Sequence, residues 1–273
     1  MINTKTKLAI QAIFIAGIAL SLLSVGCSKP PEPEAPVVVE LSPAEEGQRI
    51  LQQMSAHIAS IPAFTFETVE SLDRIGTDTT AGAYHFTRSV VVQRPSSLYF
   101  DLKSEAKPSV NIIANYNGQQ VTMQNTTNAT WARTDTLGNI DSMLNDITRR
   151  FSVPIPFADI VYSDPYNAFI GPNTKGGLAG KETIDGVEYV RLEYADDLVG
   201  IKIWTTDSVD ALPRRIELTY KKVAGEPKAL IDFSAWNLNT SIADDAFTAT
   251  INPAATELDF GTFVTNTMAD KPE

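Results

Sequence analysis

The sequence predicts one antiparallel α+β domain preceded by an N-terminal targeting segment. Short segments in which apolar and polar residues alternate recur along most of the chain, as in Leu98–Lys103. Turn residues separate these segments, and the pair Asn117–Gly118 is typical of a tight β-hairpin. Two further stretches carry apolar residues at helical spacing. The predicted domain therefore contains about ten strands with two interposed helical pieces.

The folded region is predicted to begin with a helix. Ser42 and Glu45 have the spacing of a capping box, and Pro43 occupies the first helical position. Pro62 ends the segment. Between them, apolar residues follow one helical face, at Ile50, Met54, Ile58 and Ile61. Because one face of this helix is apolar, we expect it to pack on the sheet.

The strands are predicted in two groups, separated by a helical segment at 140–151. The first group comprises residues 64–67, 86–92, 98–103, 110–114, 120–124 and 130–135. The second group comprises residues 189–194, 200–205, 214–220 and 229–236. Residues 155–161 are predicted as a short helix or loop lying over the sheet, and 171–180 as a glycine-rich loop. The tail after residue 244 is expected to be irregular, with Phe247 and Phe260 as anchors.

The N-terminal segment is predicted to be a bacterial lipoprotein signal peptide spanning residues 1–26. Lys5 and Lys7 precede an apolar run at 8–25, and a small residue stands directly before Cys27, the only cysteine of the chain. The pattern resembles a lipobox, except that serine replaces the usual leucine three residues before the cysteine. Cleavage before Cys27 would leave a cysteine that carries diacylglycerol. The alternatives are a secretory signal with a chance cysteine and an uncleaved membrane helix.

Residues 27–41 are predicted to be a lipidated cysteine followed by a tether. Four prolines fall within residues 30–36, and such a segment favours extended polyproline II over a packed core. Ser28, which follows the cysteine, is typical of lipoproteins delivered to the outer membrane. We therefore expect residues 42–273 to form one domain on the periplasmic face of the outer membrane, anchored by acyl chains such as palmitate.

The composition argues against several classes of function. The net charge of −11 disfavours nucleic-acid binding through a basic face. Once Cys27 is lipidated, no thiol remains for a disulfide, for catalysis or for a metal site. His57 and His85, the only histidines, lack partners at metal-ligand spacing. No nucleophile or phosphate-binding motif is complete. The sequence predicts neither an enzyme nor a bound cofactor or metal.

From residue 44 to residue 252, the chain resembles the superfamily of the lipoprotein carriers LolA and LolB. Within it, the chain is most similar to a family of predicted periplasmic proteins of unknown function. The motifs that carry this resemblance are the opening helix, Phe64–Phe66, Val92–Pro95, Leu98–Phe100, Asn115–Gln119, 153–156, Ile203–Trp204, Leu212–Arg214 and Asp232–Trp236. The resemblance implies an open antiparallel half-barrel with an apolar concave face under covering helices. It also implies that Arg94 helps to hold these helices closed as a lid.

Two functional hypotheses follow. In the first, the concave face binds an acyl chain or another hydrophobic ligand through Phe66, Phe86, Val90, Phe100, Leu102, Ile112 and Met123. The same side chains could instead fill a core under the helices. In the second hypothesis, the protein is a scaffold that has no ligand cavity and binds another envelope protein.

Overall fold

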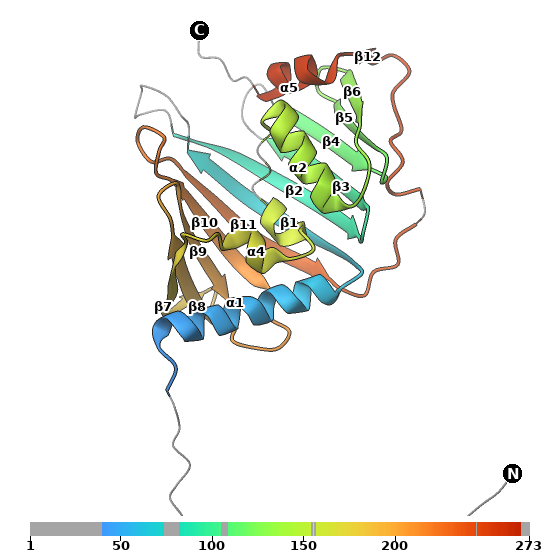
Figure 1. The fold of residues 1–273 in the computed structure, drawn as a ribbon. Helices are drawn as coiled ribbons and strands as arrows, with labels where there is room; N and C mark the ends of the chain where they lie inside the picture. The colour runs from blue at the N-terminus through green and yellow to red at the C-terminus, as the bar shows by residue number, and fades with distance from the viewer. Residues whose placement is uncertain are drawn as a thin grey trace, which may run out of the picture. The chain divides into compact units, whose positions relative to one another are not determined.

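The computed structural model describes residues 40–73, 82–104, 109–153, 155, 157–243 and 245–268. Its twelve strands form one sheet in the order β12-β6-β5-β4-β3-β2-β1-β11-β10-β9-β8-β7 (Figure 1). The terminal strands of this order do not pair with each other in the described chain, so the sheet is open. The predicted open antiparallel α+β fold is confirmed, with twelve strands instead of about ten. The predicted signal peptide, Cys27 and all but the end of the tether lie outside the described residues.

Each of the ten predicted strands lies within a strand of the structure. The first strands are β1 (Ala63–Asp73), β2 (Ala83–Gln93), β3 (Ser97–Ser104), β4 (Val110–Tyr116), β5 (Gln120–Asn125) and β6 (Thr130–Asp135). The remaining strands are β7 (Lys175–Ile184), β8 (Val187–Ala195), β9 (Val199–Thr205), β10 (Pro213–Tyr220), β11 (Lys228–Asn237) and β12 (Thr256–Glu257). The helices are α1 (Pro43–Ser60), α2 (Ile140–Phe151), α3 (Ala158–Val161), α4 (Pro165–Phe169) and α5 (Phe260–Met268).

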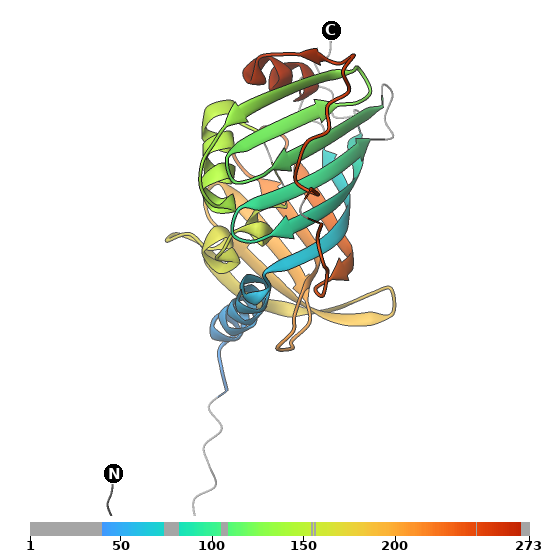
Figure 2. The same ribbon diagram turned by 90° about the vertical axis from the view of Figure 1, so that its right-hand side faces the viewer.

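Two antiparallel meanders make up the sheet. Strands β1 to β6 pair in chain order, as do β7 to β11, and the two series meet where β11 pairs with β1. Only the short β12–β6 pair is parallel. The helices α1, α2 and α4 lie on the same face of the sheet (Figure 1). On the opposite face, the chain between β11 and β12 crosses the strands as an irregular segment (Figure 2).

The predicted capping box is present at the start of α1. The Ser42 backbone N–H donates to the Glu45 carboxylate over 2.9 Å, and the Glu45 N–H donates to the Ser42 hydroxyl over 3.3 Å. Further along the helix, Gly47 lies directly against the backbone of β7, where a Cβ atom would come within 2.4 Å of the Leu178 nitrogen. Glycine therefore permits a helix–strand approach that no other residue allows at this position.

Four features differ from the sequence-based prediction. The predicted glycine-rich loop at 171–180 largely belongs to strand β7, which starts at Lys175. Gly177 in this strand allows close packing, because a Cβ atom there would lie 2.3 Å from the Pro43 carbonyl oxygen of α1. The predicted irregular tail contains β12 and the helix α5, whose Phe260 is buried as expected. The short helix α4 was also not predicted.

The hydrophobic core lies between the sheet and its helices. Its buried residues run from Ile50 in α1 to Val264 in α5, and residues 41–273 form one compact unit. The chain from residue 40 onwards therefore contains a complete core, and we expect it to fold without the preceding segment. Buried Phe247 does not belong to this core and lies in the segment that crosses the opposite face.

Candidate ligand-binding site

The register of strands β1 to β5 sets side chains in rows on the face under the helices. Residues directly opposite one another form a row that we call the cavity row, comprising Phe66, Val90, Phe100, Ala114 and Met123. The next row, the arginine row, comprises Thr68, Arg88, Leu102, Ile112 and Asn125. The third, the outer row, comprises Glu70, Phe86, Ser104 and Val110. Such rows arise because alternate residues of every strand face the same side.

The seven predicted ligand residues fall in these three rows. The cavity row contains Phe66, Val90, Phe100 and Met123, and all four are buried. The arginine row contains buried Ile112 and half-buried Leu102, and the outer row contains half-buried Phe86. The structure thus brings all seven residues to one face, while their contact with a ligand stays a prediction.

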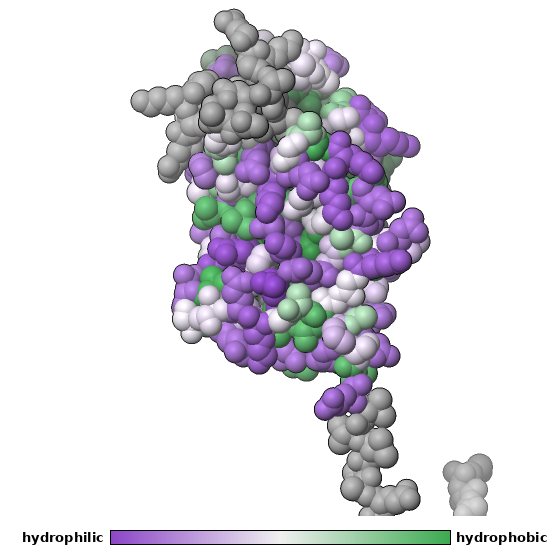
Figure 3. All heavy atoms as spheres, turned by 90° about the vertical axis from the view of Figure 1, so that its left-hand side faces the viewer, coloured by the Kyte–Doolittle hydropathy of each residue, from purple (hydrophilic) through white to green (hydrophobic). Residues whose placement is uncertain are grey.

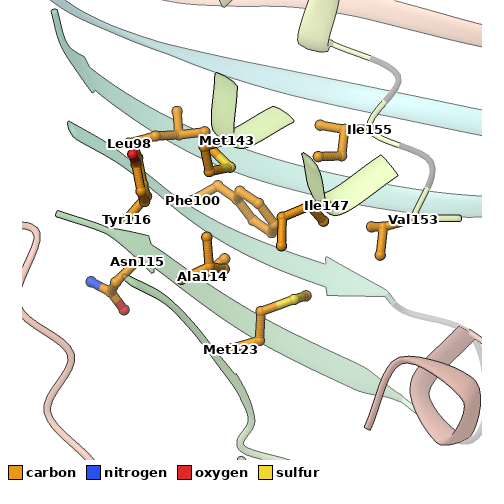
Figure 4. A pocket seen from close by; sticks show the side chains of 11 residues that line it. Leu98, Phe100, Ala114, Asn115, Tyr116, Met123, Met143, Ile147, Val153 and Ile155 are labelled. Carbon is orange, nitrogen blue, oxygen red and sulfur yellow. The ribbon is translucent and has the colours of Figure 1, made fainter. Parts of the chain in front are cut away.

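A small apolar cavity remains beside the cavity row. It has a volume of about 30 Å³ and is lined by Leu98, Phe100, Ala114, Asn115, Tyr116, Val121, Met123, Met143, Ile147, Val153 and Ile155. The side chains of Met123, Met143 and Ile147 converge on it, whereas Asn115 points away (Figure 4). Because one water needs at least about 10–15 Å³ of such volume, the cavity accommodates a small group but not an acyl chain. Side chains therefore fill most of the concave face.

Helix α2 supplies the part of this lining that the sequence interpretation missed. Met143 and Ile147 lie one helical turn apart and face strands β3 to β5. The helical spacing of Ile140, Leu144, Ile147 and Phe151 predicted the helix, but it included neither Met143 nor the strands against which the helix packs. Asn139 caps this helix by accepting the Ser142 N–H over 2.9 Å.

Arg94 joins the end of β2 to the covering helices. Its Nη1 donates to the carbonyl oxygen of Val161, the last residue of α3, over 2.9 Å, and its guanidinium lies 5.6 Å from the Phe64 ring. The Nε and Nη2 atoms are buried and have no hydrogen-bond partner in the described chain. Burial lowers the pKa of Arg94, an effect that the charge of Asp141 opposes. The contact with α3 is compatible with the predicted lid role, which stays a prediction.

A buried ion pair connects the arginine row to the outer row. The Arg88 Nε and Nη2 atoms donate to the two oxygens of Glu70, each over 2.9 Å, and both side chains are 5% exposed. The Thr68 hydroxyl donates to the same carboxylate over 2.7 Å. The guanidinium is held between two rings, 4.9 Å from the Phe100 centroid and 4.8 Å from that of Phe157.

The sequence interpretation did not single out this pair, although a signal for it exists. In β1, Thr68 and Glu70 continue the inward phase set by Phe64 and Phe66. Charged residues in the inward phase of a strand are costly unless they are paired, so their presence points to a partner on the neighbouring strand. Arg88 has the matching phase in β2.

Among the carboxyl groups that the structure describes, Asp159 of α3 has the pKa that lies furthest above its ordinary value. Burial raises its pKa to about 7. Burial also raises the pKa of Tyr220, to which the charge of Asp159 makes a smaller contribution. A carboxyl group whose pKa is higher in the folded than in the unfolded chain destabilises the fold when it ionises. This cost is absent below the unfolded value of 3.8 and is fully present above pH 7.

The substitution Asp159→Asn should therefore stabilise the protein at high pH only. We expect the free energy of unfolding to be unchanged near pH 4 and to rise by on the order of 2 kcal/mol near pH 8. Urea unfolding at both pH values measures the change, with exposed Asp245→Asn as the control. An equal gain at both pH values would show that ionisation is not its cause.

A second, polar concavity lies between α1 and α4. It is a groove of about 510 Å³ lined by Gln52, Ser55, Ala56, Ala59, Ser163, Asp164, Tyr166 and Asn167. The Tyr166 N–H donates to the Ser55 hydroxyl over 2.8 Å and ties α4 to α1. The groove is open to solvent and shares no lining residue with the apolar cavity.

Neither a metal site nor a membrane span is found in the described residues. No group of three or more His, Cys, Asp or Glu side chains there is arranged to hold a metal ion. The described helices are also too short or too polar to cross a bilayer.

The chain matches a family model over most of its length. The model is described as "Predicted periplasmic protein (DUF2092)", and it matches residues 47–261. This match confirms the resemblance to predicted periplasmic proteins that the sequence motifs indicated. No curated protein matches the chain significantly.

Solved structures with a similar fold are distant. A LolA superfamily protein from Nitrosomonas europaea is 13% identical with a TM-score of 0.39, over 75% of this chain and 98% of that one. A putative outer membrane lipoprotein-sorting protein domain from Vibrio parahaemolyticus is 8% identical with a TM-score of 0.39, over 75% and 97%. The MucA/MucB complex from Pseudomonas aeruginosa matches at 12% identity with a TM-score of 0.39, over 75% and 61%. At these values the three structures carry no argument about function.

Proposed function

The chain belongs to the family of predicted periplasmic proteins (DUF2092), and from this premise we propose that it binds an acyl chain without catalysing a reaction. The observation that carries the proposal is the apolar cavity between α2 and strands β3 to β5. Apolar cavities exclude water and favour apolar ligands. Binding would then be driven by the burial of apolar surface, worth about 25 cal/mol per Å² before ordering costs.

An acyl chain requires a cavity larger than 30 Å³, so its uptake requires movement of the surrounding side chains. Met123 of β5 and Met143 of α2 both line the cavity, one from the sheet and one from the helix above it. Methionine is unbranched and changes shape at little cost, so these two side chains are suited to make room for a ligand. We propose that the ligand enters by displacing α2 and α3 from the sheet.

Arg94 would hold this lid in its closed position. The hydrogen bond from Arg94 to Val161 joins the end of β2 to α3. Because two buried nitrogens of this half-buried side chain have no hydrogen-bond partner in the described residues, retaining Arg94 costs stability. A closing contact made by one hydrogen bond can also break without unfolding the sheet.

We further propose that Cys27 anchors the protein by its acyl chains to the periplasmic face of the outer membrane. The support is the signal pattern before Cys27, the serine after it and the proline-rich tether at 27–41. The family description predicts a periplasmic protein, which agrees with this location.

Filling the cavity tests the proposal. Ala114 lies in the cavity row and lines the cavity, so Ala114→Val places two additional carbon atoms in the space that the ligand would enlarge. We expect the affinity for a fluorescent fatty acid to fall at least about tenfold, because overpacking opposes the rearrangement. Fluorescence titration of residues 40–273 measures it, with Ala195→Val in β8 as the control. Equal affinity in wild type and Ala114→Val would contradict cavity binding.

The competing hypothesis is a scaffold that binds another envelope protein. The groove between α1 and α4 favours it, because at about 510 Å³ it is much larger than the apolar cavity and is lined mainly by polar residues. The side of the molecule shown in Figure 3 is mostly hydrophilic, and its apolar side chains are scattered. The described residues on this side therefore present no large apolar surface to a protein partner. A stoichiometric protein partner that is lost on Ala56→Arg, together with no acyl binding, would favour the scaffold.

A further inference from the structure

The buried pair Glu70–Arg88 lies beside the cavity that we propose as the ligand site. Phe100 is the shared element: one of its contacts is the Arg88 guanidinium, 4.9 Å from the ring centroid, and the same ring lines the cavity. If the cavity binds an acyl chain as proposed, this pair lies where it could contact the polar head of the ligand.

Beyond Phe100, the arginine row and the outer row contain further apolar side chains. Leu102 in the arginine row and Phe86 and Val110 in the outer row are half-buried, whereas the side chains of the cavity row are buried. An acyl chain that is too long for the cavity therefore finds its next apolar contacts along this direction. Such a chain would pass the guanidinium of Arg88.

The charges at this position are already balanced. Arg88 uses Nε and Nη2 for Glu70, and each carboxylate oxygen of Glu70 accepts one of these bonds. The Thr68 hydroxyl adds a third bond to the carboxylate. Nη1 is the guanidinium nitrogen that takes no part in this pair.

A charged headgroup does not suit such a balanced site. An anionic carboxylate beside Arg88 would also lie close to Glu70, and its desolvation would not be offset by a free counter-charge. An ester carbonyl accepts a hydrogen bond without adding a charge. We infer that the pair Glu70–Arg88 selects an uncharged acyl ester over a free fatty acid, with the Arg88 Nη1 donating to the ester carbonyl.

A competition experiment with a matched pair of probes tests this inference. Methyl laurate and laurate share one chain and differ in the charge of the head. Each is titrated near pH 8 against the neutral fluorescent probe N-phenylnaphthylamine bound to residues 40–273. We expect wild type to bind the ester at least about tenfold tighter than the ionised acid, because an uncompensated buried charge is costly.

The substitution Glu70→Gln should reverse this preference. It leaves Arg88 without a counter-charge, so the ionised laurate becomes the better partner while the affinity for the ester changes little. The control is Glu188→Gln in an exposed ion pair with Lys181, which should keep the wild-type ratio. Thermal unfolding of each variant establishes that it is folded before its ratio is interpreted.

The outcomes separate the two proposals. If wild type binds both probes equally, or binds laurate more tightly, the selection by Glu70–Arg88 is wrong while acyl binding stands. If folded Glu70→Gln keeps the wild-type ratio of ester affinity to laurate affinity, the selection is also wrong while acyl binding stands. If neither probe displaces the dye, acyl binding itself fails, and the inference fails with it. If Glu70→Gln does not fold, the ratio of the two affinities in wild type alone tests the selection of the ester.

Discussion

The substitution Arg88→Met should lower the free energy of unfolding by about 3–5 kcal/mol, because it leaves the buried Glu70 carboxylate without its partner. Both side chains are 5% exposed, so water cannot replace the two hydrogen bonds that are lost. The contacts of the guanidinium with the rings of Phe100 and Phe157 disappear as well. Urea unfolding of residues 40–273 near pH 7 measures the loss.

Two further variants show whether the missing partner is the cause. In the double variant Glu70→Leu with Arg88→Met, no charge remains buried, and we expect most of the lost stability to return. Arg133→Met removes a half-exposed arginine and should change the stability by no more than about 0.5 kcal/mol. A double variant as unstable as Arg88→Met would mean that packing, and not the unpaired charge, accounts for the loss.

The substitution Cys27→Ala should abolish lipidation completely, because the chain has no other cysteine to carry the acyl groups. In cells labelled with radioactive palmitate, we expect the label on the protein to fall to background. Mass spectrometry should find residues 1–26 still attached to the variant, since the lipoprotein signal peptidase cleaves before a lipidated cysteine.

The neighbouring residue provides the control for this experiment. Ser28→Ala leaves the cysteine intact, so labelling and cleavage should both remain. Palmitate label that persists in Cys27→Ala would contradict the lipoprotein assignment. A mature wild-type chain that starts at any residue other than Cys27 would contradict it too.

The sequence was most informative where structure depends on local interactions. The capping box of Ser42 and Glu45, the apolar stripe of α1 and the alternation in β3 each depend on residues a few positions apart. Strand β7 was missed because its glycines are typical of a loop. Gly177 instead allows the close approach of α1, which is a contact between segments about 130 residues apart.

The candidate site was predictable only in part. The period-two pattern identified the inward side chains of the cavity row, because it follows from strand geometry alone. It could not give the volume left between them, since that volume depends on how Met143 and Ile147 of α2 pack against the sheet. The pair Glu70–Arg88 could have been inferred from its inward phase once the register of β1 and β2 was known.

Native mass spectrometry of residues 40–273 purified from bacterial extract tests acyl binding most directly. We expect a bound species with the mass of an acyl lipid, which is lost when the protein is denatured and is reduced in Ala114→Val. A protein that carries no adduct and also fails to bind added fluorescent fatty acid would contradict the proposal. The concave face would then be a filled core, and the groove between α1 and α4 would become the site to investigate.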